Sequence, residues 1–209
     1  MKPIRSIFIG IAIFAAVACN QAPTEDQGPK YDNAVVENIM TRRSIRKYKA
    51  EPVSRELLTK IMECGINAPN GQNRQSWEVR VVDNPATMDK IKALMVAGNP
   101  DLKPEMVEGG FRGAPVMLFL ARDPEYPFSA YDCGLLAENI MLSAWSYGVG
   151  SICLGIPVRF IMGNEKCQPV LDLLDFSEGY EFCLCIGLGY PDETPAAKPR
   201  KMEKVKFID

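Results

Sequence analysis

Residues 133–148 read CGLLAENIMLSAWSYG and carry the longest helical pattern in the chain. Apolar and small residues recur there with a period near 3.6, and Gly148 suits the end of a helix. The repeating positions are Cys133, Leu136, Ala137, Ile140, Met141 and Ala144. The opposite side of this expected helix is also apolar, because it carries Leu135, Leu142 and Trp145. A helix that is apolar nearly all round is expected at the buried centre of the fold.

Helix and strand patterns alternate on both sides of this helix. Helices are expected near 35–40, from the N-cap residue Ser54 to a stop before Pro69, at 88–96 and at 170–174. Strands are expected at 77–82, 115–121, 151–155 and 182–188. The strand at 115–121 is a nearly continuous apolar run, which is typical of a strand buried on both faces. This order predicts an α+β fold, an α/β sandwich in which helices flank a mixed sheet.

The composition excludes several classes of function. The net charge is −2 and the isoelectric point is about 5.4, so no overall basic field favours nucleic acid. The chain contains no histidine, which excludes a Ser-His-Asp or Cys-His catalytic site, an HExxH zinc site and a haem ligated by histidine. It has no complete G-x-G-x-x-G motif and no P-loop, so neither nucleotide site is expected.

Seven cysteines need an explanation: Cys19, Cys64, Cys133, Cys153, Cys167, Cys183 and Cys185. No two form a CxxC pair, so neither a zinc knuckle nor a thioredoxin-like site is indicated. Four of the six beyond Cys19 fall on apolar stripes or runs, which favours buried thiols of low reactivity. Disulfides stay an open alternative outside the cytoplasm. Cys183 and Cys185 are expected to face the same side of one strand.

The N-terminal residues are predicted to lie outside the fold. Lys2 and Arg5 precede an uncharged apolar stretch of 12 residues, Ser6 to Val17. This stretch is too short for a membrane-spanning helix of about 20 residues but suits the core of a signal peptide. The small residues that lead to Cys19 resemble a bacterial lipobox, which implies that Cys19 becomes the lipidated first residue of the mature chain. The alternative is an ordinary signal peptide with a chance cysteine at the cleavage point.

Three segments follow from this interpretation. Residues 1–18 form the lipoprotein signal peptide, residues 19–30 form the lipidated cysteine and a flexible tether, and residues 31–209 form the folded domain. The tether is rich in proline, glycine, glutamine and acidic residues, a composition that does not fold by itself. The protein is therefore expected in the bacterial cell envelope, on the periplasmic or surface side, with a lipid anchor in the membrane.

A basic cluster follows the first expected helix, where residues 42–48 read RRSIRKY. Guanidinium groups and a hydroxyl can donate several charge-assisted hydrogen bonds to a phosphate dianion. Taken alone, such a run more often marks a solvated turn, or a patch for anionic lipid headgroups. The phosphate interpretation therefore depends on the motifs that accompany it.

Three further motifs place polar or glycine-rich segments beside expected strands. Residues 68–77 read APNGQNRQSW, and their amides can hydrogen-bond to the edge of a heteroaromatic ring, although a simple polar turn is the alternative. Residues 150–157 read GSICLGIP, where a strand runs to a glycine that leaves its backbone open to a ligand. Residues 187–191 read GLGYP and are followed by Lys198-Pro199-Arg200.

In order and spacing, these four motifs together resemble the nitroreductase family of flavoproteins over nearly all of residues 31–209. The resemblance implies an interlocked homodimer with FMN in each of two clefts between the subunits. It implies that the ribityl phosphate is held by Arg42, Arg43, Ser44 and Arg46, with Lys198 and Arg200 closing over it. Pro69, Asn70, Gly71 and Asn73 would come from the partner subunit, Gln75 would lie near the ring, and the backbone of Leu154 and Gly155 would face flavin N5. Ser76 departs from the proline that relatives usually carry, which is expected to loosen the turn without removing the site.

The resemblance also implies the chemistry. The flavin takes a hydride at N5 and passes two electrons to a nitroaromatic, a quinone or a similar small acceptor, so no catalytic side chain is expected. The donor would be NAD(P)H or, because a lipoprotein faces away from cytoplasmic nicotinamides, another carrier. One alternative is reductive dehalogenation of a halophenol, as in the similar iodotyrosine deiodinases, but the stretch expected to form their lid, residues 98–110, lacks a tyrosine. The other alternative is a non-enzymatic surface lipoprotein that retains the fold.

Overall fold

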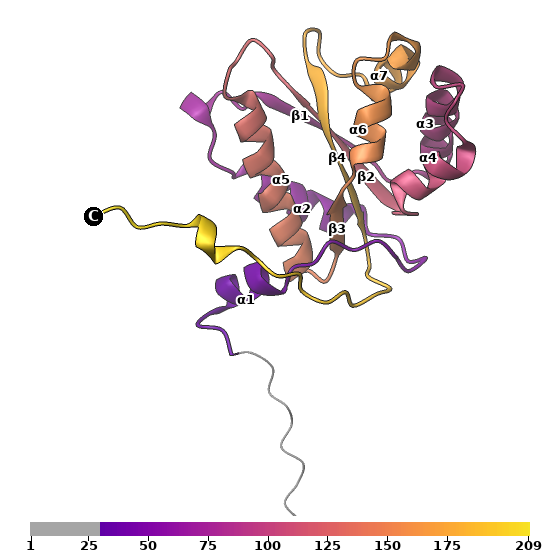
Figure 1. The fold of residues 1–209 in the computed structure, drawn as a ribbon. Helices are drawn as coiled ribbons and strands as arrows, with labels where there is room; N and C mark the ends of the chain where they lie inside the picture. The colour runs from indigo at the N-terminus through magenta and orange to yellow at the C-terminus, as the bar shows by residue number, and fades with distance from the viewer. Residues whose placement is uncertain (1–29) are drawn as a thin grey trace, which may run out of the picture.

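The computed structural model describes residues 30–209 (Figure 1). The expected signal peptide, Cys19 and all of the tether except Lys30 lie outside these residues. Within residues 30–209, no helix is both long enough and apolar enough to cross a membrane.

Four strands form one sheet in the order β1-β2-β4-β3. They are β1 (Trp77–Val82), β2 (Val116–Arg122), β3 (Gly150–Cys153) and β4 (Glu181–Gly189). The α+β class is confirmed, but these four strands do not form the expected mixed sheet, because every neighbouring pair is antiparallel. β2 and β3 do run in the same direction, and β4 lies between them. A parallel pairing is added at the free edge of β3 by the bridge between Ser44 and Ser151.

Helices cover both faces of the sheet (Figure 1). On one face lie α2 (Arg55–Ile66) and α5 (Ser129–Ser146). On the other lie α3 (Pro85–Gly98), α4 (Pro104–Phe111), α6 (Gly155–Ile161) and α7 (Gln168–Leu174). Each face has its own apolar core, and β2, which supplies side chains to both, is fully buried from Met117 to Ala121. The short helix α1 (Ala34–Thr41) packs on the outside of α5.

The helix α5 is only partly as expected. Its repeating stripe from Cys133 to Ala144 is buried, but its outer face is not, since Leu135 is 45% exposed and Tyr131 is 70% exposed. α1 packs on the C-terminal half of this outer face and leaves the N-terminal half free. The expectation of a helix buried all round is therefore wrong for a single chain.

Two helices were not expected. α4 contains Gly109 and Gly110, whose low helix propensity hides its pattern. The strand expected at 151–155 ends at Cys153, and Gly155 begins α6 instead. Pro157 lies in the first turn of that helix, where proline is tolerated because its nitrogen needs no helical partner.

The cysteines among residues 30–209 are all free. Cys133, Cys167 and Cys185 are buried as expected, whereas Cys64 and Cys153 are exposed. Cys183 and Cys185 do not share a face, because the register between β2 and β4 shifts at Leu120 and Ala121. This irregularity places Cys185 in the core beneath α6 and α7, and Cys183 against the core beneath α5.

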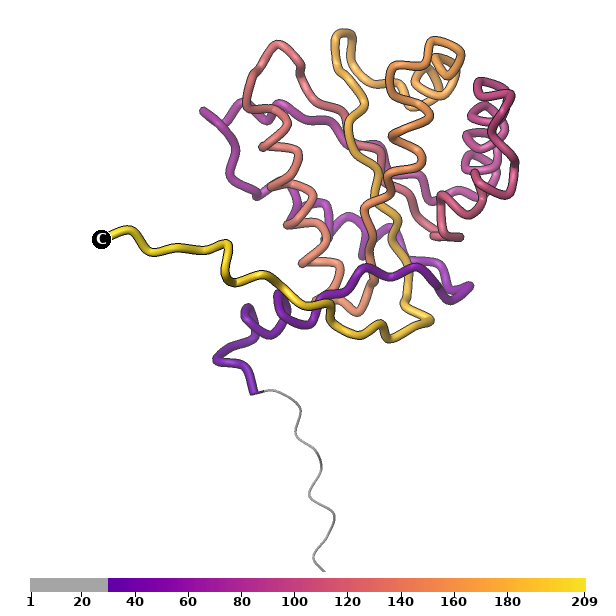
Figure 2. Tube along the Cα trace, viewed as in Figure 1, coloured from indigo at the N-terminus to yellow at the C-terminus, as the bar shows by residue number. Residues whose placement is uncertain are grey.

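The C-terminal segment leaves the domain as an arm (Figure 2). It contains the short 3₁₀-helix η3 (Met202–Lys204) and ends at Asp209. Its apolar side chains are exposed, and Phe207 is 88% accessible in the single chain. α1 carries a second exposed apolar group, formed by Val35, Ile39 and Met40.

Candidate functional site

The two ends of the domain meet in a basic pocket of about 260 Å³. Five of the lining side chains are positive and none is a carboxylate. The lining residues are Arg42, Arg43, Ser44, Arg46, Pro195, Ala196, Lys198 and Arg200. All six residues that the sequence predicted for a phosphate site are therefore brought together, although they come from opposite ends of the chain.

The first half of this pocket is held by the sheet. Ile45 is completely buried, and its N–H donates to Ser151 O at 3.0 Å. Gly150 permits this contact, because a Cβ at that position would lie 2.6 Å from Cγ1 of Ile45. Ile45 points into the core while the neighbouring Arg46 is exposed, which explains why an apolar residue interrupts the basic run.

The second half of the pocket follows from a pairing between residues 47–49 and 190–192. Lys49 N–H donates to Tyr190 O, and Asp192 N–H donates to Lys47 O, each at 2.9 Å. The hydroxyl of Tyr48 donates to Ile45 O at 2.8 Å. Burial of this hydroxyl, and then the negative charge of Glu193, raise the pKa of Tyr48 above its ordinary value. These contacts direct residues 195–200 back to the end of α1.

The guanidinium groups of the pocket differ in how they are already engaged. Arg43 donates to the carbonyls of Met40 and Arg42, each at 2.8 Å, and so caps the end of α1. Arg46 Nη1 donates to Ser44 O at 3.0 Å, and its backbone N–H bonds to a carboxylate oxygen of Glu193. Each of these groups keeps further N–H donors, because a guanidinium has five.

The predicted amide motif forms an exposed turn around the 3₁₀-helix η1 (Gly71–Asn73). Three residues of this turn that are not glycine have positive φ: Gln72 at 56°, Asn73 at 54° and Gln75 at 50°. Such conformations cost on the order of 1–3 kcal/mol each and persist only where surrounding contacts impose them. Backbone strain of this kind concentrates at binding sites.

Contacts to α5, to Asn70 and to Tyr126 hold the shape of the turn. Gly71 N–H donates to Asp132 Oδ1 at 3.0 Å, and Gln75 N–H donates to Asn70 Oδ1 at 2.9 Å. Glycine at position 71 lets the ring of Tyr126 approach, because a Cβ there would lie 1.9 Å from the hydroxyl of Tyr126, which would have to shift. The Arg74 guanidinium stacks over the ring of Tyr126, 4.6 Å from its centroid.

The third motif leaves one backbone donor open. Leu154 N–H is used by the sheet, since it donates to Cys185 O at 2.8 Å. Gly155 begins α6, where the first N–H groups of a helix have no partner within the helix. A Cβ at Gly155 would meet no atom within 4 Å. Of the two predicted residues, Gly155 is therefore the one whose N–H can face a ligand.

The basic pocket and the amide turn lie at opposite ends of α5 in one chain. α1 leads into the pocket and is docked near the C-terminus of α5, where Asn38 Nδ2 donates to Leu142 O at 2.9 Å. The turn is docked in the first turn of α5, at Asp132. At 1.5 Å per residue these two docking points are about 15 Å apart along the helix. The structure thus groups the predicted residues of the basic cluster and of the amide motif into two half-sites, whereas Leu154 and Gly155 lie apart from both at the start of α6.

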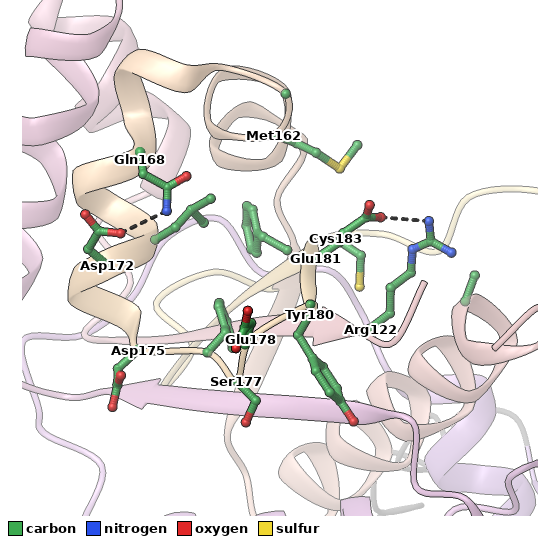
Figure 3. Close-up of a pocket in the computed structure, with 16 residues that line it drawn as sticks. Arg122, Met162, Gln168, Asp172, Asp175, Ser177, Glu178, Tyr180, Glu181 and Cys183 are labelled. Carbon is green, nitrogen blue, oxygen red and sulfur yellow. Dashed lines mark hydrogen bonds and ion pairs between the residues drawn. The ribbon is translucent and has the colours of Figure 1, made fainter. Parts of the chain in front are cut away.

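A larger cavity, of about 840 Å³, contains none of the predicted residues (Figure 3). It is lined by α7, by the loop that follows α7 and by the start of β4. Carboxylates of Asp172, Asp175 and Glu178 line it beside apolar side chains, and Glu181 pairs with Arg122 at 2.9 Å. Cys183 of β4 also lines this cavity. No motif in the sequence pointed to it.

No group of histidine, cysteine, aspartate and glutamate side chains suited to a metal ion occurs within residues 30–209.

The chain is similar in sequence and in fold to known proteins. The model of the nitroreductase family matches residues 39–190. A nitroreductase from Desulfitobacterium hafniense, solved with bound FMN, is 32% identical with a TM-score of 0.74, and the match covers 85% of this chain and 99% of that one. An FMN-dependent nitroreductase from Clostridium difficile is 25% identical with a TM-score of 0.69, covering 85% and 100%. The NADPH-flavin oxidoreductase of Vibrio harveyi is 27% identical over 190 residues, 80% of this chain and 70% of its own length. The chain belongs to the nitroreductase family.

Proposed function

We propose that the protein binds FMN and is an oxidoreductase that passes two electrons to a small acceptor such as a nitroaromatic or a quinone. The observation that carries this proposal is the basic pocket formed by Arg42, Arg46, Lys198 and Arg200 from the two ends of the domain. Support comes from similar proteins, which are named a nitroreductase with bound FMN, an FMN-dependent nitroreductase and an NADPH-flavin oxidoreductase.

The residues of the site fit the parts of FMN. A phosphate dianion matches a pocket with five positive side chains and a hydroxyl. The amide turn offers donors and acceptors for a heteroaromatic ring, and Gly155 offers an open N–H. When bound, FMN supplies the hydride and electron transfer. The protein's own residues bind and orient it, and none of them is needed as an acid or base.

The proposed site is completed by a second copy of the chain. The turn at Gly71 lies at the far end of α5 from the basic pocket of its own chain. Two copies with antiparallel α5 helices would bring the turn of one chain toward the pocket of the other. The exposed apolar side chains of α1, α5 and the C-terminal arm form a surface that favours such burial.

We further propose that Cys19 is lipidated and that the domain works at the cell envelope. This proposal rests on the apolar stretch from Ser6 to Val17 and on the small residues before Cys19. A domain held there is separated from cytoplasmic nicotinamides. The donor is then NAD(P)H only where the nicotinamide reaches this compartment, and otherwise another carrier.

The two alternatives have less support. The stretch expected to form the lid of a dehalogenase folds instead into the end of α3 and α4, where Glu108 pairs with Lys92 at 2.9 Å. A surface lipoprotein without a cofactor gives no reason for five positive side chains to converge on one pocket.

Anaerobic reduction of the bound flavin tests the proposed function. Bleaching near 450 nm would be followed with NADH, NADPH and an artificial one-electron donor, and reoxidation with nitroaromatics, quinones and halophenols. We expect bleaching by at least one donor and rapid reoxidation by nitroaromatics or quinones. Reoxidation by halophenols alone would favour the dehalogenase, and a protein that takes up no FMN would refute the proposal.

A further inference from the structure

Asp132 is a buried carboxylate that connects two backbone segments of the amide turn. Its side chain lies in the first turn of α5, and the residue is only 3% exposed. Oδ1 accepts the N–H of Gly71 at 3.0 Å, and Oδ2 accepts the hydroxyl of Ser76 at 2.7 Å. The two bonds hold the two ends of the turn, on either side of the strained residues Gln72, Asn73 and Gln75.

Ser76 is suited to this contact in a way that proline is not. Its side chain is 2% exposed and donates to Asp132. Gln75, which precedes it, has a φ of 50°. A proline at position 76 would lack the hydroxyl and would push Gln75 toward extended backbone. The expectation that Ser76 loosens the turn is therefore not met, because its hydroxyl ties the turn to α5.

We infer that Asp132 and Ser76 are positioning residues, which hold the turn of one chain against the flavin bound by its partner. This inference rests on the proposed function. The strained conformations of Gln72, Asn73 and Gln75 are not favoured by the chain itself and must be imposed by contacts. Without the carboxylate, the N–H of Gly71 and the hydroxyl of Ser76 lose their partners and the turn relaxes away from the shape that meets the ring.

Substitutions test the role of the carboxylate. Asp132→Ala and Ser76→Ala should each weaken FMN and riboflavin binding equally, by roughly ten-fold for Asp132→Ala, because the turn contacts the ring and not the phosphate. Asp132→Asn keeps an acceptor for Gly71 N–H, so its affinity should stay within about three-fold of the wild type. The matched control is Ser129→Ala, which removes a buried hydroxyl without a partner from the same helical turn and should leave both affinities unchanged.

Thermal unfolding of the flavin-free variants separates positioning from folding. If Asp132→Ala lowers the melting temperature but binds both flavins as tightly as Ser129→Ala, the role is structural and the inference is overturned. Ser76→Ala provides the second test, because it removes one bond and keeps the carboxylate that accepts Gly71 N–H.

Mixed dimers test whether the contact acts on the partner's flavin. An Arg46→Ala chain and an Asp132→Ala chain, co-expressed with different tags, would be purified as the heterodimer. If Asp132 serves the partner's site, one site of this dimer carries both defects and the other carries none. We expect one FMN per heterodimer at wild-type affinity, although neither homodimer binds that tightly. A heterodimer without any site of wild-type affinity would overturn the inference, whereas a wild-type protein that binds no FMN would instead refute the proposed function.

Discussion

The indole N–H of Trp145 donates a hydrogen bond to the hydroxyl of Thr41, with 2.9 Å between Nε1 and Oγ1. Thr41 is the last residue of α1, and Trp145 lies near the end of α5. The bond therefore fixes the point at which α1 ends and the basic pocket begins with Arg42. The indole on the outer face of α5 thus makes a polar contact with α1 that the apolar pattern did not reveal.

Replacing this indole should affect both stability and cofactor binding. Trp145→Phe removes one net hydrogen bond, so the unfolding free energy should fall by about 0.5–1.5 kcal/mol, with a FMN affinity several-fold weaker. Trp77→Phe is the control, because the indole nitrogen of Trp77 is buried without a partner. Thermal unfolding and FMN titration measure both effects. Equal FMN affinity in the Trp145 and Trp77 variants would show that the bond does not position the pocket.

Removing one arginine of the pocket should weaken FMN more than it harms folding. Arg46 is exposed, so Arg46→Ala should leave stability nearly unchanged. Loss of a charge-assisted contact to phosphate should cost on the order of 1.5–3 kcal/mol, roughly ten- to a hundred-fold in affinity. Riboflavin lacks the phosphate, so its affinity for the Arg46→Ala protein should equal that for the wild type. The control is Arg159→Ala, which removes an exposed arginine outside the pocket and should leave the affinity for both flavins unchanged. Equal loss of FMN and riboflavin in Arg46→Ala would mean that the pocket does not hold phosphate.

Stability should depend on pH through the pair formed by Arg55 and Asp83. Arg55 donates two hydrogen bonds, at 2.6 and 2.8 Å, to the two oxygens of Asp83. These bonds hold the pKa of Asp83 below its ordinary value. Because the pKa of Asp83 is lower in the folded chain than in the unfolded chain, the pair stabilises the fold above the unfolded pKa of about 3.9. This stabilisation is lost as the pH falls through the folded pKa of Asp83.

Urea unfolding of the wild type and Arg55→Gln at pH 7 and at pH 2–3 checks this dependence. The difference in unfolding free energy should be present at pH 7 and should shrink in acid. A difference that stays constant down to pH 2 would assign the effect of Arg55 to packing.

The full-length chain should carry lipid on Cys19 and partition with membranes, and Cys19→Ser should become soluble. Each buried methylene of an acyl chain contributes about 0.8 kcal/mol, so three chains hold the protein effectively permanently. A tether of residues 20–30 reaches roughly 15–20 Å if it behaves as a flexible chain. Mass spectrometry and fractionation are the measurements. A Cys19→Ser protein that stays in the membrane, or an unlipidated cytoplasmic wild type, would refute the anchor, and NAD(P)H would then become the expected donor.

Local patterns predicted much of this fold. The strand at Trp77–Val82 was placed at its observed bounds, and Ser54 caps α2 through a bond from Leu57 N–H to its hydroxyl. These features depend on neighbours in sequence. The antiparallel pairing of all four strands and the reversal of Cys183 depend on how β2 and β4 meet, which no local pattern encodes.

In the candidate site, too, local sequence predicted some features and missed those that depend on the folded chain. The sequence identified the six residues of the basic pocket by their chemistry, and the structure brings them together. It did not indicate that Leu154 N–H is taken by Cys185 or that Arg43 caps α1, because both bonds depend on the folded backbone. Asp132 was also missed: it lies 61 residues from Gly71, and a single carboxylate in a helical pattern carries no signal of its own.

Flavin content and molecular mass, measured together on the purified chain from residue 20 onward, test most directly whether two chains share each FMN site. Analytical ultracentrifugation with detection at both 280 and 450 nm gives the two quantities for the same species. We predict a yellow dimer with about one FMN per chain, released by heat because no covalent bond holds it. A colourless protein that takes up no added FMN, or a monomer that binds FMN tightly at micromolar concentration, would contradict the claim that two chains share each FMN site.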